Sequence, residues 1–290
     1  MAQVILKNIW KEYRAGDAAV RDLNLEIQDK EFVCLLGPSG CGKSSTLRMI
    51  AGLEAITRGE LYIDGKLVNN VSPRNRDIAM AFENYALYPD LTVYDNIAFP
   101  LWVRKTDKDE TARKVNEVAA LMGITDLLQE GVKGLSGGAK QRIGVARALV
   151  RNPKVLLLDE PISHLEEELK AKMREELRKL QRQLEVTTIY VTHDQIEAMT
   201  MADRIAIMDK AVLQQYADPE TVFKRPTNIF VGGFIGEPPM NFIDCELVQE
   251  GGEYFIKNQN MRVILPKNRA AQMKKDVGKE MVLGIRNTHM

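Results

Sequence analysis

The chain has 290 residues, 45% hydrophobic and 28% charged, as expected of a globular protein with one large and one smaller domain. Its 40 basic and 40 acidic side chains cancel, so no overall field draws it toward nucleic acid, and we expect no nucleic-acid partner. The three cysteines, Cys34, Cys41 and Cys245, are odd in number and widely spread, which indicates free thiols in a reducing compartment.

The N-terminal stretch MAQVILKNIWKEY lacks the basic flank and long apolar core of a signal peptide. Nor does the sequence contain a run of roughly 18 or more apolar residues that would span a bilayer. If the protein serves a membrane process, we therefore expect it to dock on other proteins.

Strand-like and helix-like segments alternate along the first two thirds of the chain. A strand is expected from Val4, and the apolar runs 31–37, 154–160 and 187–193 predict three buried strands. Charged, helix-favouring sequence at 108–122 and 165–184 predicts helices between them. This alternation predicts an α/β fold with a mainly parallel sheet covered on both faces.

The sequence changes character near Pro226, where glycine and proline become frequent. Short strand-like runs separated by turn residues follow, namely FIDCELVQ, EYFIKN, MRVILP and MVLGIR. We therefore place a domain boundary near residue 235, giving domains 1–235 and 236–290. The second stretch is short for an independent β-barrel, so we expect it to be an incomplete β-rich domain.

A phosphate-binding loop is predicted at Gly37–Ser44, where GPSGCGKS fits G-x-x-x-x-G-K-[ST] between a buried strand and a helix. The alternative, a chance glycine turn, is disfavoured by that context. Loop and first-turn N–H groups would bind phosphate oxygens, while Lys43 reaches the terminal phosphates and Ser44 ligates Mg²⁺. The expected ATP-binding residues of the loop are Gly37, Pro38, Ser39, Gly40, Cys41, Gly42, Lys43, Ser44 and Ser45.

Two acids and one histidine end predicted buried strands. We assign Asp159 to the metal and Glu160 to the general base, because phosphoryl transfer depends on positioning and charge stabilisation. His193, at the end of YVTH, would contact the γ-phosphate and orient the attacking water. A solvated acid pair and an ordinary surface histidine are the alternatives, and the preceding phosphate loop argues against both.

The segment LSGGAKQR, Leu135–Arg142, followed by IGVARAL, resembles the signature of the ABC ATPase family. The resemblance covers residues 4 to about 240. It implies a P-loop NTPase core, a helical subdomain at roughly 84–150 and an OB-like C-terminal domain. In that family the signature closes over the γ-phosphate bound by a second subunit, a role that would fall to Ser136, Gly137 and Gly138. The same Ser-Gly-Gly is also an ordinary helix N-cap.

Further matches refine the resemblance. Tyr13 stands where the family stacks an aromatic ring on adenine, and SHLEEEL matches the loop that crosses the dimer interface. The segment AFENYALYPDLTVYDNIAFPL resembles the stretch that touches the membrane subunits. Together with FIGEPPMNF and the β-rich tail, NYALYP is similar to the maltose-type sugar-importer branch.

The sequence departs from the family pattern at three places, the last of which includes two residues. Glu83 replaces a glutamine that ligates magnesium and water. At ~4 Å and an effective dielectric of ~20, its charge would interact by about 4 kcal/mol, attracting Mg²⁺ and repelling phosphate. Ala139 replaces the last glutamine of the signature, and the interface loop reads SHLE, with His164 and Glu166, rather than SNLD.

The resemblance implies an ATP-hydrolysing motor of an ABC importer for a sugar or related solute, peripheral on the cytoplasmic face of the plasma (inner) membrane. Its cofactors would be ATP and Mg²⁺, the latter held by Ser44, Glu83 and Asp159. Its partners would be a second ATPase subunit, identical or different, integral permease subunits and an extracytoplasmic solute-binding protein. The alternatives are a weakly or non-hydrolysing partner in a heterodimeric ABC complex and a soluble ABC ATPase of DNA repair or translation.

Overall fold

A computed structural model describes residues 2–14, 16–82, 84–273, 275 and 277–287. By its internal contacts the chain divides into two compact units, Met1–Val222 and Phe223–Met290. The domain boundary near residue 235 stays a prediction, because helix α8 (Ile229–Phe234) precedes it yet belongs to the second of these units. Each unit is considered by itself below.

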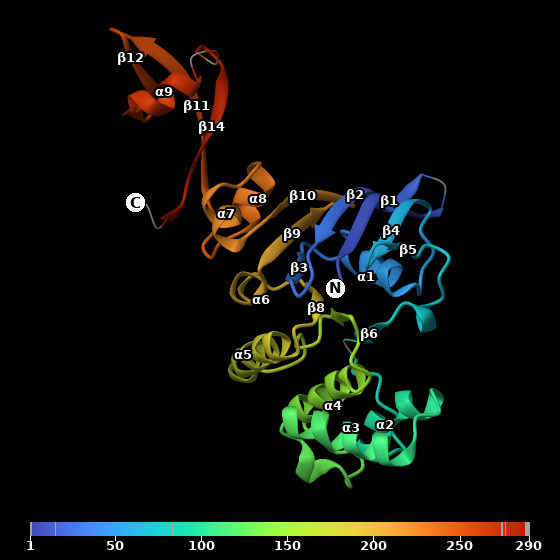
Figure 1. Cartoon of the computed structure of the whole chain (residues 1–290). Helices are drawn as coiled ribbons and strands as arrows, with labels where there is room; N and C mark the ends of the chain where they lie inside the picture. The colour runs from blue at the N-terminus through green and yellow to red at the C-terminus, as the bar shows by residue number, and fades with distance from the viewer. Residues whose placement is uncertain (1, 15, 83, 274, 276, 288–290) are drawn as a thin grey trace. The chain divides into compact units, whose positions relative to one another are not determined.

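The first unit is built on a six-stranded sheet in the order β10-β9-β3-β8-β7-β6 (Figure 1). The strands are parallel except β10, which pairs antiparallel with β9. Every residue of β3, β7 and β8 is buried, which confirms the three buried strands predicted from apolar runs. The bounds are β3 (Phe32–Leu36), β6 (Ile78–Ala81), β7 (Val155–Asp159), β8 (Thr187–Thr192), β9 (Arg204–Asp209) and β10 (Val212–Ala217).

A second, antiparallel sheet of the first unit has the order β2-β1-β4-β5. Helix α1 (Lys43–Ala51) shares a hydrophobic core with both sheets, to which it contributes Leu47, Met49 and Ile50. Because side chains alternate along a strand, Val33 and Leu35 of β3 enter this core. The bounds are β1 (Val4–Arg14), β2 (Asp17–Ile27), β4 (Arg58–Ile63) and β5 (Lys66–Leu67).

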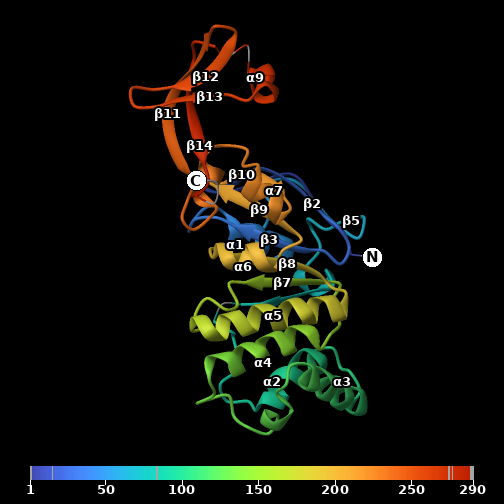
Figure 2. The same ribbon diagram turned by 90° about the vertical axis from the view of Figure 1, so that its left-hand side faces the viewer.

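Between β6 and β7 the chain forms a helical part, which Figures 1 and 2 both show gathered on one side of the six-stranded sheet. It consists of α2 (Val93–Val103), α3 (Lys108–Leu121), the 3₁₀ turn η2 (Thr125–Leu127) and α4 (Gly137–Leu149). Helix α5 (Glu167–Leu184) lies next to α4 in both views, and α6 (Gln195–Met201) follows β8. The predicted helices at 108–122 and 165–184 are confirmed as α3 and α5.

The second unit contains α8 and an antiparallel sheet in the order β13-β12-β11-β14. All four predicted strand-like runs are strands, while helix α9 was not expected from the sequence. A small core of Cys245, Leu247, Ile256, Leu265 and Ala270 lies within it. The bounds are β11 (Asn241–Glu250), β12 (Glu253–Lys257), β13 (Arg262–Ile264), α9 (Lys267–Met273) and β14 (Glu280–Ile285), and the short helix α7 (Pro219–Lys224) spans the boundary between units.

The C-terminus of α1 is held by Arg76, which follows the 3₁₀ turn η1 (Pro73–Asn75) and is 6% exposed. Its Nη1 donates to the carbonyl oxygens of Met49 and Ile50 at 2.8 and 2.9 Å, and its Nε donates to Val71 O at 2.8 Å. The last carbonyls of a helix have no partner within the helix, so this buried guanidinium gives Ile50 O a charged donor and adds a second donor to Met49 O, which also accepts from the N–H of Gly52 at 3.1 Å.

We expect Arg76→Met to lower the free energy of unfolding by about 3 kcal/mol, because two helix-end carbonyls would lose their charged donor. Equilibrium urea unfolding measures this. The matched control is Arg74→Met, since Arg74 is exposed on the same turn and should change stability by less than about 0.5 kcal/mol. Equal stability of the two variants would contradict this role for Arg76.

Candidate functional site

The loop Gly37–Gly42 joins the end of β3 to the start of α1 and wraps tightly. Gly42 has φ 107°, and a Cβ built there would lie 2.2 Å from the carbonyl oxygen of Ala19. A Cβ at Gly37 would lie 2.1 Å from Met208 O. Only glycine fits where neighbouring backbone approaches this closely. The glycine spacing of the motif therefore follows from crowding on both sides of the loop.

The N-terminus of α1 is open to an anion. No described side chain forms a capping hydrogen bond there, so the first-turn amides of the helix keep unused N–H groups. The positive end of the helix dipole adds to the attraction for negative charge. Lys43, Ser44 and Ser45 begin this helix, so the structure places the last three predicted loop residues on its first turn.

Lys43 is 5% exposed, and its ammonium group turns back over the loop. Its Nζ donates to Gly37 O at 2.8 Å and to Pro38 O at 2.9 Å, and lies 3.8 Å from Cys41 Sγ. These acceptors are neutral, so they do not neutralise the buried positive charge. An ammonium surrounded by carbonyl oxygens at the mouth of an amide-lined loop suits a phosphate group.

Cys41 lies in the wall of this loop and is 3% exposed. Burial raises the pKa of its thiol, although the Lys43 ammonium works in the opposite direction. A protonated, buried thiol is a small packing residue rather than a reactive one.

Ser44 and Asp159 come together across 115 residues of sequence. Ser44 Oγ donates to Asp159 Oδ1 at 3.2 Å, and Asp159 ends the buried strand β7 with 8% exposure. A hydroxyl beside a carboxylate fits Mg²⁺, which prefers oxygen ligands and keeps several positions for water and phosphate. Among the described residues no cluster of three acidic, histidine or cysteine side chains forms an all-protein metal site. Glu83, the third predicted metal ligand, lies outside the described residues.

Glu160 and His193 form the second pair of the site. The Nδ1 atom of His193 lies 2.9 Å from Glu160 Oε2, and the two side chains are 57% and 21% exposed. Glu160 has φ 45°, an unusual value for a residue with a side chain, and its N–H donates to Val191 O at 3.0 Å. The left-handed turn after β7 thus directs the carboxylate toward the end of β8, where His193 follows.

A buried carboxyl group supports the turn that carries His193. Glu197 is 2% exposed, and its Oε2 accepts hydrogen bonds from Thr192 Oγ1 at 2.6 Å and Tyr190 Oη at 2.9 Å. Thr192 Oγ1 in turn accepts from the N–H of Asp194 at 3.0 Å. Burial raises the pKa of Glu197, while the two hydroxyl donors lower it. Sequence reasoning missed Glu197, because its role depends on contacts between β8 and α6.

Tyr13 lies on β1 and is 54% exposed, with Lys11 Nζ 4.8 Å from the centre of its ring. Its hydroxyl lies 3.0 Å from Ser45 Oγ and also donates to Glu54. The structure thus brings Tyr13 beside the first turn of α1, as an adenine-stacking ring requires. Glu54, which also pairs with Arg48, follows α1 and carries no motif by which the sequence could have revealed it.

The signature residues lie at the start of α4. Ser136 is the N-cap residue, and its Oγ accepts from the N–H of Ala139 at 3.3 Å. A Cβ at Gly137 would lie 3.2 Å from Leu165, and one at Gly138 would lie 3.1 Å from Leu169. Within this chain α4 belongs to the helical part, apart from α1 in both views of Figures 1 and 2. The chain therefore brings together the loop, Asp159, Glu160, His193 and Tyr13, but not the signature.

Two family models match the sequence. One is described as ABC transporter and matches residues 20–163, and the other is described as MalK OB fold domain and matches residues 236–290. The trehalose/maltose import ATP-binding protein MalK of Thermococcus litoralis is 52% identical over 99% of this chain and 78% of its own length. The oligosaccharides import ATP-binding protein MsmX of Bacillus subtilis is 50% identical over 99% of this chain and 78% of its own length.

Solved structures are similar in fold. The dimeric, post-hydrolysis structure of the ATP-binding cassette MJ0796 bound to ADP and Pi has a TM-score of 0.66 and 30% identity, covering 74% of this chain and 98% of that one. The structure of cbiO1 from Clostridium perfringens, part of an ABC transporter complex, has a TM-score of 0.71 and 26% identity. It covers 77% of this chain and 90% of that one.

Glu197 predicts a pH dependence of stability. Its pKa in the folded protein is raised above the ordinary value of 4.5 by burial, so the stability it contributes is fully present below about pH 4.5. That contribution declines as the pH rises through the folded-state pKa. Glu197→Gln cannot titrate, so the unfolding free energy of the wild type minus that of the variant should fall as the pH rises above 4.5. Urea unfolding at several pH values measures it, and a constant difference would contradict the assignment.

Proposed function

This chain belongs to the ATP-binding subunits of ABC transporters, and on that premise we propose that it is the ATP-hydrolysing motor of an importer for a sugar or related solute. The observation that carries the proposal is the meeting, at one edge of the six-stranded sheet, of Lys43, the Ser44–Asp159 pair and the Glu160–His193 pair. The relatives named for trehalose/maltose and oligosaccharide import support the solute class.

ATP is bound by the loop Gly37–Ser44. Its amides and the first turn of α1 hold the phosphate oxygens, and the Lys43 ammonium exchanges its carbonyl partners for the terminal phosphates. Ser44 and Asp159 would hold Mg²⁺, which would supply positive charge against the phosphate oxygens when bound. We propose Glu83 as a third oxygen ligand of Mg²⁺. Tyr13 stacks on the adenine.

Glu160 serves as general base. Its carboxylate is mostly shielded and directed by a strained turn, so it is held where it can accept a proton from the attacking water. His193 is more exposed and hydrogen-bonds to that carboxylate, so it can contact the γ-phosphate and orient the water. Positioning of this kind supplies most of the rate in phosphoryl transfer.

The site is completed by a second subunit. Ser136, Gly137 and Gly138 begin a helix that is distant from the loop of their own chain, so they seal the phosphates bound by a partner. Two nucleotides then close two subunits like a clamp, provided that ATP binds the closed state better than the open one. The similar cassette whose structure is described as dimeric, bound to ADP and Pi, supports this arrangement.

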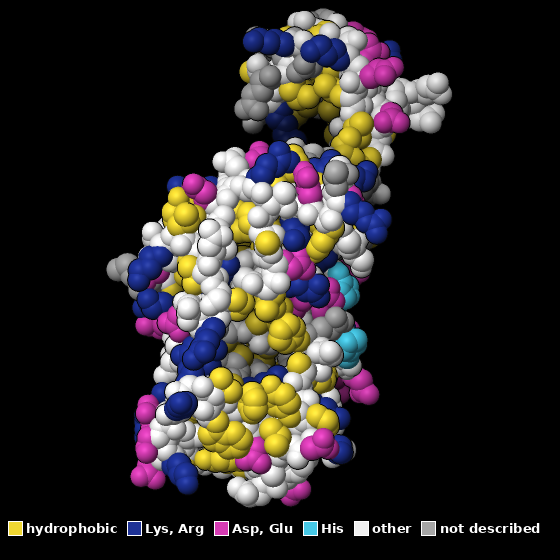
Figure 3. All heavy atoms as spheres, turned by 90° about the vertical axis from the view of Figure 1, so that its right-hand side faces the viewer, with side chains coloured by type: hydrophobic (Ala, Val, Ile, Leu, Met, Phe, Trp, Pro, Cys, Tyr) yellow, Lys and Arg dark blue, Asp and Glu magenta, His cyan; other side chains and the backbone are white. Residues whose placement is uncertain are grey.

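The membrane partner docks on a groove beside the helical part. The groove has a volume of about 320 Å³, and apolar side chains line it together with the basic side chains of Arg74, Arg147 and Arg151. The apolar residues include Leu53, Met80, Phe82 and Pro100. Figure 3 shows hydrophobic side chains gathered on the face that carries the helical elements, with Lys and Arg side chains next to them. No described helix is long and apolar enough to cross a bilayer. The proposal includes a peripheral position on the cytoplasmic side of permease subunits, with a solute-binding protein on the opposite side.

A second candidate is a weakly hydrolysing or non-hydrolysing partner in a heterodimeric complex. Glu83 and Ala139 favour it, because they replace two glutamines of the family pattern. The pairs Ser44–Asp159 and Glu160–His193 support the hydrolysing motor, because they bring the proposed metal ligands together and the proposed base beside the proposed water-orienting histidine.

An ATPase assay separates the two candidates. Glu160→Gln should lower kcat by about 100-fold or more while leaving ATP affinity within twofold, because only the proton acceptor is lost. The control Glu130→Gln changes an exposed acid of the helical part and should retain the wild-type rate. Equal rates for wild type and Glu160→Gln would favour the non-hydrolysing candidate.

Co-purification tests the membrane partner. Leu53→Asp introduces a charge into the groove, so it should reduce recovery of integral membrane subunits at least fivefold without changing basal ATPase activity. The control Leu67→Asp places the same charge at an equally exposed leucine, 51% against 52%, outside the groove. The ATPase subunits in the same preparation can also be counted. A single kind of ATPase subunit, present at two copies per complex, rules out the heterodimer.

A further inference from the structure

Helix α4 carries the signature on its first turn and Arg147 on its last turn. Arg147 donates from Nη1 to Ala86 O at 2.8 Å and from Nη2 to Tyr85 O at 2.9 Å. Residues 85 and 86 belong to the loop between β6 and α2. The side chain thus ties the end of the signature helix to the backbone of a loop that leaves the six-stranded sheet.

That loop starts beside the metal-binding carboxylate. Strand β6 pairs in parallel with β7, with Ala81 opposite Leu158, the residue before Asp159. The loop backbone is strained, because Tyr85 and Ala86 have φ values of 59° and 45° in succession. Residues with side chains adopt such values only when their surroundings hold them, and such strain gathers at functional sites. The hydrogen bonds from Arg147 hold both carbonyls.

Tyr85 extends this contact along the helix. A Cβ built at Gly144 would lie 3.5 Å from Tyr85 O, and one built at Gly137 would lie 3.7 Å from the Tyr85 hydroxyl oxygen. Seven helical residues, about 10 Å along the axis, separate the two glycines. The tyrosine therefore lies against α4 from its last turns to the signature itself.

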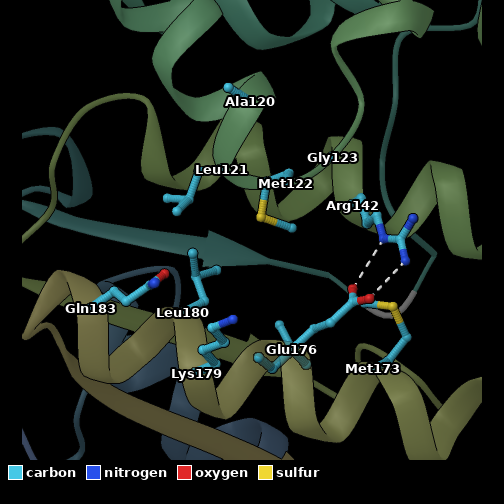
Figure 4. Close-up of a pocket in the computed structure, with 11 residues that line it drawn as sticks. Ala120, Leu121, Met122, Gly123, Arg142, Met173, Glu176, Lys179, Leu180 and Gln183 are labelled. Atoms are coloured by element: carbon cyan, nitrogen blue, oxygen red, sulfur yellow. Dashed lines mark hydrogen bonds and ion pairs between the residues drawn. The ribbon is translucent and has the colours of Figure 1, made fainter.

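On the opposite side of α4, Arg142 forms a bidentate ion pair with Glu176 of α5, with nitrogen–oxygen distances of 3.0 and 3.2 Å. The two side chains are 28% and 48% exposed, so water partly screens this contact. Figure 4 shows this pair at one end of a cavity of about 470 Å³, with Leu121 and Met122 facing Leu180 across it. Within the described residues, the amide of Gln141, buried on α4 with 1% exposure, has no hydrogen-bond partner.

We propose that Arg147 is a positioning residue that locks α4 to the loop after β6, so that the position of this loop sets the position of the signature. The inference rests on the proposed function, because the signature acts on nucleotide bound by a second subunit. Since α4 is one continuous helix, a displacement of residues 85 and 86 moves its first turn as well. The strained loop, rather than the exposed contact with α5, then determines whether the clamp can close.

The test uses the full chain in the Glu160→Gln background, in which ATP should drive formation of a stable dimer. Adding Arg147→Met should raise the ATP concentration for half-maximal dimerisation at least tenfold, as measured by analytical ultracentrifugation. Arg147→Lys keeps one hydrogen-bond donor but loses the planar guanidinium that reaches both carbonyls. Its ATP concentration for half-maximal dimerisation should therefore be intermediate. The control Glu176→Gln removes the link to α5 and should leave the midpoint unchanged within twofold.

ADP affinity separates positioning from folding, because ADP needs only the loop Gly37–Ser44 of one subunit. We expect ADP affinity to stay within twofold in every variant. An unchanged dimerisation midpoint in Arg147→Met, or an equal loss of ADP affinity, would overturn the inference alone. Failure of the Glu160→Gln parent to dimerise with ATP would overturn the proposed function as well. If Arg147→Met does not fold, Tyr85→Ala should raise the ATP concentration for half-maximal dimerisation in its place. A midpoint equal to that of Glu160→Gln alone would reject the proposal.

Discussion

The parallel register of three buried strands is the constraint on which the site depends. Leu36 at the end of β3 pairs with Thr192 at the end of β8, and Asp159 at the end of β7 pairs with Val191. The three chain segments therefore leave the sheet at the same edge. A phosphate loop, an acid pair and a histidine, which lie far apart in the sequence, become neighbours because the hydrogen-bond ladder aligns the strands that precede them.

The site places several ionisable groups out of water, and each one has partners suited to its task. Carbonyl oxygens hold Lys43, a hydroxyl bonds to Asp159, and two hydroxyls bond to Glu197. Burial of charge without such partners would be strongly unfavourable. Glu160 and His193 are more exposed than these groups, while Glu197 is buried and stabilises the turn that carries His193.

The helical part carries residues that are proposed to act on a second subunit. Its signature turn does not reach the nucleotide loop of its own chain, so its contribution depends on where α4 points. The contacts of Arg147 and Tyr85 make that direction a property of the loop after β6, which begins next to the strand end that carries Asp159. Nucleotide binding at one edge of the sheet is thus linked, through helix α4, to the position of the signature that the second subunit uses.

The sequence alone determined the chemistry and most of the elements. Apolar runs predicted the buried strands, G-x-x-x-x-G-K-S predicted the phosphate loop, and LSGGAKQR indicated the family, because local patterns encode strands, tight turns and helix caps directly. Only the tertiary structure decided which distant groups meet. Glu54 beside Tyr13, Glu197 beneath Thr192, Arg76 at the end of α1 and Arg147 on the loop at residue 85 carry no local signal. Their roles arise from contacts between elements far apart in the chain, which no short stretch of residues specifies.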